Sequence, residues 1–193
     1  MDIAFTPAVK AAQTRRGFRE GYARMEAKGT SRTAIDAGLA KFIANTRSFY
    51  MATANSSGQP YIQHRGGPSG FLCVLDDQTL AFADFPGNCQ YISTGNLDEN
   101  PNAMIFIMDY RRRHRVKIWG TAKVVENDDA LIEKLMPDNY VARAEAAVVF
   151  TVESWDTNCP QHIPLMIFAD DVETLAERIA ALEAENARLR AAL

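Results

Sequence analysis

The residues best suited to bind a charged ligand follow one another at the end of a predicted strand. The segment reads Tyr61-Ile62-Gln63-His64-Arg65-Gly66-Gly67-Pro68, so an amide, an imidazole and a guanidinium come directly before two glycines. Glycines at a strand end let a ligand approach the backbone closely. The planar guanidinium of Arg65 suits a phosphate group. The alternative is that Arg65 is a surface charge before an ordinary turn.

A second polar segment, Asp84-Phe85-Pro86-Gly87-Asn88-Cys89-Gln90-Tyr91, joins a predicted strand to what looks like a helix start. Free backbone N–H groups at a helix start attract anions. Asn88, Cys89 and Gln90 are therefore candidate ligand contacts. Residues 93–101 return the chain to the next strand, and the alternative is that they are simply a turn-rich connection.

The run from Arg111 to Lys117 is strongly basic, although the whole chain carries a net charge of −3. Because side chains alternate along a strand, Arg113, Arg115 and Lys117 are expected on one face. Three explanations compete: a solvated edge strand, a nucleic-acid footprint, and a phosphate and flavin pocket. The negative net charge and the lack of interleaved aromatic residues argue against nucleic acid.

Polar and aromatic residues also gather after the last predicted strand, where Trp155, Cys159 and His162 lie close together in the sequence. Cys159 and His162 have a spacing that could chelate zinc, but no second pair of ligands with regular spacing exists, so we expect no metal. Cys159, before a proline, is interpreted as a small buried apolar residue. His64 and His162 are the candidates for proton transfer, although a structural role is preferred for each and no catalytic residue is assigned.

These residues require a sheet to position them. Apolar spacing predicts helices over 7–28 and 33–45 and a short helix over 129–135, with the second helix packing its apolar face on the sheet. Short β-rich segments separated by turn residues are typical of an antiparallel barrel. The expected strands are Phe49–Ala54, Tyr61–Arg65, Phe71–Leu75, Leu80–Asp84, Ala103–Asp109, Val116–Val125 and Ala147–Trp155.

The C-terminal segment, from Asp170 to Leu193, has a different pattern. Seven residues repeat at alternating steps of three and four, which are heptad a and d positions: Val172, Leu175, Ile179, Leu182, Asn186, Leu189 and Leu193. A lone asparagine at an a position favours a parallel two-stranded coil and fixes its register. The alternative is an amphipathic helix folded onto its own barrel.

Composition limits the class of protein. A chain of 193 residues with 47% hydrophobic residues is best read as one domain with one core. Three widely separated cysteines and no recognisable leader suggest the reducing cytoplasm. Charged residues interrupt every apolar run, so we expect a soluble protein that spans no membrane and binds no nucleic acid.

Taken together, these segments resemble the pyridoxamine 5′-phosphate oxidase-like family of FMN-binding split barrels, in particular its smaller uncharacterised branch. The resemblance extends from about Pro7 to Pro164. The strings that carry it are Pro7-Ala8-Val9, Phe49-Tyr50-Met51-Ala52-Thr53-Ala54, Tyr61 to Pro68, Asp84-Phe85-Pro86-Gly87-Asn88, Gly95-Asn96-Leu97, Asp109-Tyr110 and Asn158-Cys159-Pro160-Gln161-His162.

The resemblance implies a mainly β fold with flanking helices, an α+β chain built on a six-stranded antiparallel split β-barrel. Together with the heptad pattern, it divides the chain into an N-terminal helical arm (1–46), an FMN-binding barrel (47–168) and a C-terminal coiled-coil-like heptad helix (169–193). FMN would lie at the interface of a homodimer. The implied FMN contacts are Gln63, His64, Arg65, Asp84, Asn88, Cys89, Gln90, Arg115, Lys117 and Trp155. Arginine is usual at the position of Cys89, so this phosphate site departs from the family pattern.

The resemblance implies a cytoplasmic, FMN-dependent oxidoreductase that acts on a small molecule, without implying the vitamin-forming reaction itself. Arg115 would meet the ring system, and Trp155 would border it from the other subunit. One alternative is a non-catalytic module that binds or senses a flavin or another planar ligand, such as haem or a deazaflavin. A further alternative is a dimeric scaffold with a zipper tail.

Overall fold

The structure is a computed structural model that describes residues 2–29, 32–138, 140–157 and 160–191. Asn158, Cys159 and Leu193, which enter the sequence argument, lie outside these residues. The chain divides into two compact units, Met1–Met108 with Arg115–Asn158, and Asp109–His114 with Cys159–Leu193. Each unit is described by itself. Among the described helices, none has both the length and the apolar character needed to cross a bilayer.

Seven strands of the described chain form one sheet in the order β2-β1-β5-β6-β7-β4-β3. The pairs β1–β2, β1–β5, β3–β4, β4–β7 and β6–β7 are antiparallel. The strands are β1 (Ser48–Ala54), β2 (Pro60–Gly66), β3 (Cys73–Val74), β4 (Thr79–Asp84), β5 (Asn102–Asp109), β6 (His114–Val125) and β7 (Ala146–Thr157). The predicted split β-barrel is confirmed with seven strands in place of six, and the predicted strand Phe71–Leu75 is reduced to the two residues of β3.

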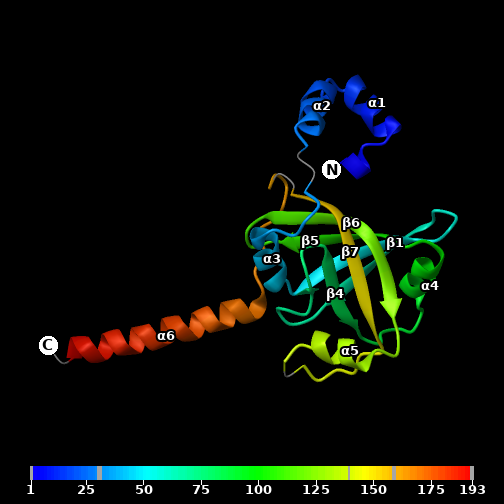
Figure 1. Cartoon of the computed structure of the whole chain (residues 1–193). Coiled ribbons are helices and arrows are strands. Elements are labelled where there is room, and N and C mark those ends of the chain that lie inside the picture. Colours follow the sequence, from blue (N-terminus) through cyan, green and yellow to red (C-terminus); the bar gives the residue numbers. More distant parts are fainter. Residues whose placement is uncertain (1, 30–31, 139, 158–159, 192–193) are drawn as a thin grey trace. The chain divides into compact units, whose positions relative to one another are not determined.

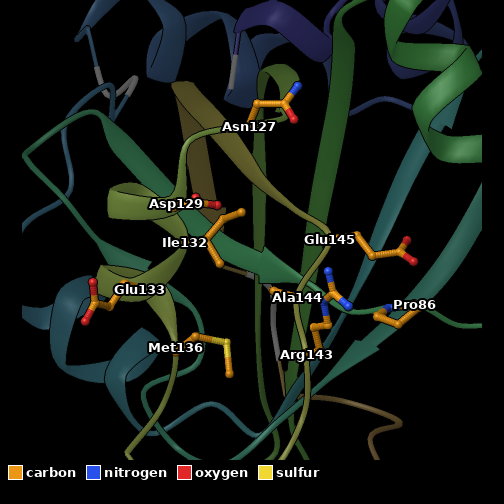
Figure 2. Close-up of a pocket in the computed structure, with 9 residues that line it drawn as sticks. All are labelled: Pro86, Asn127, Asp129, Ile132, Glu133, Met136, Arg143, Ala144 and Glu145. Carbon is orange, nitrogen blue, oxygen red and sulfur yellow. The ribbon is translucent and has the colours of Figure 1, made fainter.

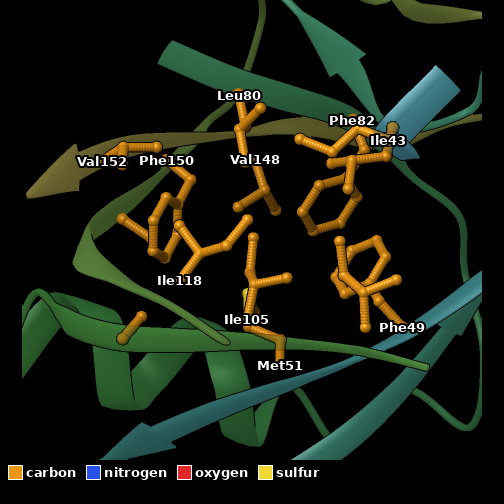
Figure 3. Close-up of a cluster of buried hydrophobic side chains, with 14 of the residues drawn as sticks. Ile43, Phe49, Met51, Leu80, Phe82, Ile105, Ile118, Val148, Phe150 and Val152 are labelled. Carbon is orange, nitrogen blue, oxygen red and sulfur yellow. The ribbon is translucent and has the colours of Figure 1, made fainter. Parts of the chain in front are cut away.

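The core of the barrel is filled by side chains that alternate along the strands (Figure 3). In β1, Phe49 and Met51 are fully buried while Tyr50 is 37% exposed, which is the period-two pattern of a sheet with one face inward. Phe49 contacts Phe71 and Phe82, with ring centroids 5.5 and 5.2 Å apart. Each fully buried side chain of this size contributes about 1.5–3 kcal/mol by leaving water.

Helix α3 (Ala37–Ala44) covers part of this core (Figure 1). Asp36 caps it, because its carboxylate accepts a hydrogen bond from the backbone N–H of Leu39 at 2.8 Å. Leu39 and Ile43 are buried in the barrel core. The helix is shorter than the predicted 33–45, since the N–H of Ile35 is bonded to the carbonyl of Asp77 in a turn of the barrel.

The predicted N-terminal helix over 7–28 is wrong as one element. After the short 3-10 turn Asp2–Ala4, the structure has α1 (Pro7–Arg15) and α2 (Arg19–Ala27). The break falls at Gly17, whose φ is +77°. The N–H of Gly17 bonds to the carbonyl of Thr14 and the N–H of Phe18 to that of Gln13, which is a Schellman ending.

Two short helices connect strands. The region whose alternative role was a turn-rich connection is largely helical, forming α4 (Ile92–Glu99), so that alternative is wrong. Helix α5 (Asp129–Leu135) has the predicted bounds and is capped by Asp128. Its Leu135 is buried against Ala81, Ala83 and Ala147, so α5 covers the outward face of β4 and β7.

The second unit contains helix α6 (Ala169–Ala191), which matches the predicted C-terminal helix. Acidic residues lie in its first turn and arginines in its last turn, an arrangement that complements the helix dipole. Within this unit, Arg111 lies 3.9 Å from Asp171 in the first turn of α6. The predicted boundaries at 46/47 and 168/169 stay predictions.

Candidate functional site

Strand β2 presents its predicted residues on two faces. Gln63 and Arg65 are opposite the core residues Met51 and Phe49 of β1, so their side chains lie on the inward face of the sheet. His64 is opposite Tyr50, on the outward face, with the two rings 5.6 Å apart. Alternation along the strand therefore separates three neighbouring site residues into two groups.

Arg65 is the positively charged residue near the end of β2, and its side chain is only 13% exposed. It forms a close ion pair with Asp84 at the end of β4, and its guanidinium carbon lies 5.5 Å from the centre of the Phe82 ring. Its Nε atom is buried and has no hydrogen-bond partner among the described residues. A buried guanidinium with an open donor is a candidate for an anionic ligand.

The pKa of the Asp84 carboxyl is raised. Burial has the largest effect, because removing the carboxylate from water disfavours its charged form. The neighbouring Arg65 acts in the opposite direction but does not outweigh burial. Asp84 is thus easier to protonate than an ordinary aspartate.

The loop after β4 carries Asn88, Cys89 and Gln90 beside Arg65. Cys89 and Tyr91 have φ values of 55° and 50°, in the left-handed region that non-glycine residues seldom adopt. The Tyr91 hydroxyl donates to Glu145 at 3.3 Å, and a hydrogen bond with Cys89 is the main reason that the pKa of Tyr91 is raised. Two strained positions in one loop fit a functional segment.

Helix α4 begins directly after this loop. Its first intrahelical bond runs from the N–H of Gly95 to the carbonyl of Tyr91, at 2.9 Å. The N–H groups of Ile92, Ser93 and Thr94 therefore precede the helical ladder and carry the positive end of the helix dipole. The predicted helix start is confirmed, since a helix begins at Ile92, four residues after Asn88.

Two contacts fix α4 beside β1 and β2. The Ser93 hydroxyl donates to the Gln63 side-chain carbonyl at 2.8 Å, and the buried Asn96 amide donates to Thr53 at 3.0 Å. Nothing in the local sequence marked Ser93 as a partner of Gln63, since the two residues are 30 positions apart. The sequence could indicate the helix start but not the strand that it would contact.

These parts enclose a hollow of about 40 Å³. Six of the ten predicted contacts line it: Gln63, Arg65, Asp84, Asn88, Cys89 and Gln90. The sequence analysis missed further lining residues, among them Tyr61, Ser93 and Glu145. Ligand sites usually measure about 300–1,000 Å³, so this hollow is too small to hold a whole ligand of that class by itself.

A larger hollow of about 770 Å³ lies next to it and has the usual size of a ligand site (Figure 2). It shares Pro86 and Glu145 with the small hollow, while Ile132, Met136 and Arg143 belong to the large one alone. None of the ten predicted contacts lines it. The larger hollow thus has the size of a ligand site, whereas the small hollow has the residues predicted to bind the ligand. We favour the small hollow, because its hydrogen-bond donors suit an anion.

The other four predicted contacts lie away from the small hollow. His64 lies on the outward face of β2. Lys117 is partly exposed on β6, with its ammonium 3.5 Å from Asp156 and 5.0 Å from the Trp119 ring centre. Arg115 alternates with the buried Val116, and its Nε is a second buried donor without a partner among the described residues.

Trp155 is 5% exposed and donates from its indole nitrogen to the carbonyl of Ala34 at 2.8 Å. Arg32 covers its ring at 4.5 Å. The role of Trp155 beside a partner's flavin stays a prediction, and such contact requires the Arg32 side chain to move aside.

Gly66 and Gly67, at the end of β2, were expected to leave room for a ligand, but the structure shows other residues of the chain packed close to them. A Cβ at Gly67 would lie 2.7–2.8 Å from atoms of Phe71, and one at Gly66 would lie 3.0 Å from the His64 ring. Close packing against Phe71 therefore accounts for glycine at position 67, whereas at Gly66 the exposed His64 side chain could turn away from a Cβ.

The zinc and proton-transfer hypotheses gain no further support from the described residues. Among the described residues, no group of three or more His, Cys, Asp or Glu side chains gathers around a common point. Cys159 lies outside these residues, so its pairing with His162 stays untested. His162 has a φ of 63°, in the turn that follows β7.

The fold defines a split-barrel protein with a donor-rich corner at one end of β2 and β4. The chain belongs to the pyridoxamine 5′-phosphate oxidase family, whose model matches residues 35–159. This match covers more than half of the chain. No curated protein matches it closely.

Solved structures support the same fold. HupZ of Group A Streptococcus is similar with a TM-score of 0.52 and 19% identity, over 68% of this chain and 99% of that one. A Lactobacillus delbrueckii protein, described provisionally as a pyridoxamine 5′-phosphate oxidase, has a TM-score of 0.52 and 18% identity, over 65% and 95%. At these identities the likeness establishes the fold alone.

Proposed function

We propose that this protein binds FMN between two copies of the chain and acts as an oxidoreductase on a small molecule. Family membership supports a flavin-type cofactor. It does not assign the vitamin-forming reaction or any particular substrate. Bound FMN would supply the chemistry, which is the reversible uptake of electrons or hydride, and the chain would bind, orient and tune it.

The observation that carries the proposal is the meeting of Arg65 with the first turn of α4 at one hollow. Arg65 offers a buried donor without a partner among the described residues, and Ile92, Ser93 and Thr94 lie at the positive end of the helix. A charged guanidinium and a helix start are two independent ways to bind a phosphate. The donor set therefore fits the phosphate end of FMN.

The amides of Gln63, Asn88 and Gln90 add neutral donors to this corner. Asp84 would orient Arg65 rather than contact the ligand, since a carboxylate repels phosphate.

The size of the hollow supports a site shared by two chains. About 40 Å³ is far below the roughly 300–1,000 Å³ of a usual ligand site, so the ring of a flavin must lie elsewhere. His64 and Lys117 lie outside the hollow, and Tyr50 and Ile62, on the same outward face as His64, are 37% and 62% exposed. In a homodimer, the outward face of one chain would cover the ring whose phosphate the other chain binds.

Arg115 and Lys117 would act on the ring. A cation near the pyrimidine side of a flavin stabilises the anionic reduced form and raises the reduction potential. Arg115 is the better candidate, because its buried Nε is open whereas Lys117 lies near Asp156. His64 and His162 stay the candidates for proton transfer.

One observation favours a second candidate function, a non-catalytic module that binds or senses a flavin or another planar ligand such as haem or a deazaflavin. Cys89 stands where the resemblance leads one to expect arginine, and two carboxylates, Asp84 and Glu145, line the same hollow. Fewer cationic donors would weaken the binding of a phosphate dianion. A ligand with less charge at this end would bind better.

Spectroscopy of the purified full-length protein separates the two functions. A yellow protein, or a colourless one that turns yellow and quenches flavin fluorescence on titration with FMN, is expected. Bleaching by a reduced nicotinamide and recovery in air would support the oxidoreductase. A protein that does not respond to FMN would refute FMN binding and favour the module.

We also propose that the protein works in the cytoplasm. The described cysteines, Cys73 and Cys89, are free thiols. A reducing compartment keeps such thiols reduced, which supports this location.

A further inference from the structure

Helix α6 carries a row of apolar side chains that lie exposed along its length. The row, here called the heptad stripe, consists of Val172, Leu175, Ile179, Leu182, Asn186 and Leu189. Its five apolar members are 42–59% exposed. A contiguous apolar surface of this kind usually marks an interaction site.

We propose that α6 pairs with α6 of a second copy of this chain as a parallel, in-register, two-stranded coiled coil. The a positions of the stripe hold the β-branched residues Val172 and Ile179, and every d position holds leucine. β-Branched residues at a with leucine at d favour two parallel strands over three or four. The stripe therefore specifies the number of helices as well as their contact face.

Asn186 decides the orientation. In a parallel in-register pair, an a residue faces its own copy, so the two Asn186 amides can hydrogen-bond to each other. In an antiparallel pair, an a residue faces a d residue, so Asn186 would face a leucine. A buried amide without a partner is destabilising, which disfavours the antiparallel arrangement.

The charges beside the stripe support the same register. In a parallel coil, a g residue lies near the e residue of the next heptad on the other helix. This rule places Arg178 near Glu183 of the second copy. It likewise places Glu185 near Arg190 of that copy, so both kinds of contact join opposite charges.

A shift of one heptad would remove this match. Arg178 of one helix would then face Arg190 of the other, and Glu185 of that second helix would face Glu183 of the first. Exposed ion pairs add little stability, so these residues act mainly by excluding the wrong registers.

The coil is short, because the heptad stripe from Val172 to Leu189 covers fewer than three heptads. Its formation rests in part on the proposed homodimer, because a second contact between the same two chains raises the effective concentration of α6. The opposed charges at the two ends of α6 also favour the helical state.

The test is disulfide cross-linking of the full-length protein. In Leu189→Cys, a parallel coil places the two new thiols side by side at a d position, within the reach of a disulfide. Ala184→Cys is the matched control, because residue 184 is an f position that faces away from the partner. The unmodified chain measures the background from Cys73, Cys89 and Cys159.

We expect the 189–189 bond, identified by peptide mass, to form about tenfold faster than the 184–184 bond, since the coil raises the effective concentration of one pair only. Equal rates for the two variants would overturn the coil. Cross-linking of Val172→Cys chains to Leu189→Cys chains, with neither linking to its own kind, would overturn the parallel orientation.

A further full-length variant, Leu182→Lys, separates this inference from the proposed function. Lysines at a central d layer should break the coil and slow the 189–189 cross-link to the control rate. If that variant is monomeric in solution while the Leu189→Cys chain cross-links, the coil stands and the barrel homodimer fails. If Leu182→Lys remains a dimer and Leu189→Cys cross-links no faster than Ala184→Cys, the coil is refuted and the barrel homodimer stands.

Discussion

Arg65 of β2 and Asp84 of β4 form an ion pair although β1, β5, β6 and β7 lie between their strands in the sheet. The sheet curls until strands near its two ends meet through side chains. The contact of Phe49 with Phe82, at 5.2 Å, joins β1 to β4 in the same way. Closure of the barrel therefore creates the donor-rich corner, because neither strand alone brings a cation, a carboxylate and the start of α4 together.

Arg65→Ala should weaken FMN binding by about 1.5–3 kcal/mol, which is the usual range for a hydrogen bond to a charged group. The affinity is measured by quenching of flavin fluorescence on titration. Arg143→Ala is the matched control, since this arginine lines only the larger hollow. An effect of Arg143→Ala without one of Arg65→Ala would place the phosphate in the larger hollow instead.

Cys89→Arg should tighten FMN binding by about 1.5–3 kcal/mol, because it adds a charged donor at the position where the resemblance leads one to expect arginine. Cys89→Ser serves as the control and should bind FMN as the unmodified chain does. Both substitutions retain the φ of 55° at this position, so backbone strain is matched. Equal affinity of the arginine and serine variants would count against a phosphate beside residue 89.

Asp84 should make stability depend on pH. Burial raises its pKa in the folded protein above the ordinary 3.8, so the folded state holds this proton more tightly than the unfolded state. Between 3.8 and the raised pKa, unfolding releases a proton, and the stability that Asp84 contributes falls as pH rises through that window.

Asp84→Asn does not titrate and provides the reference. The free energy of unfolding of the unmodified protein minus that of Asp84→Asn, from urea titrations at several pH values, should decrease as pH rises above 3.8. An increase over the same range would show that the Arg65 charge outweighs burial.

Gly120→Ala should destabilise the fold by about 3 kcal/mol, as expected for overpacking against backbone. A Cβ at Gly120, beside the bulge in β6, would lie 1.9 Å from the carbonyl oxygen of Thr151 in β7. Gly95→Ala, in the exposed part of α4 with no atom within 4 Å of a new Cβ, should instead stabilise by about 0.5–1 kcal/mol. Urea unfolding of both variants tests the contrast.

Local sequence patterns predicted much of the barrel. The turn after β1 is one example, because the Asn55 side chain accepts from the N–H of Ser57 and of Gln59, and Gly58 has a φ of +84°. Gly17 could have indicated the break between α1 and α2. The apolar residues on both sides of Gly17 favoured one continuous helix over 7–28, so the prediction missed the break.

The sequence by itself determined which segments form strands and named six of the residues that line the small hollow, because periodicity and turn chemistry act between near neighbours in the chain. Only the tertiary structure decided that Gln63 and Arg65 share the hollow with Ser93 while His64 faces outward, and that Phe71 fills the space over Gly67. The physical reason is that strand register and barrel closure fix contacts between residues far apart in the chain, and no local pattern carries that information.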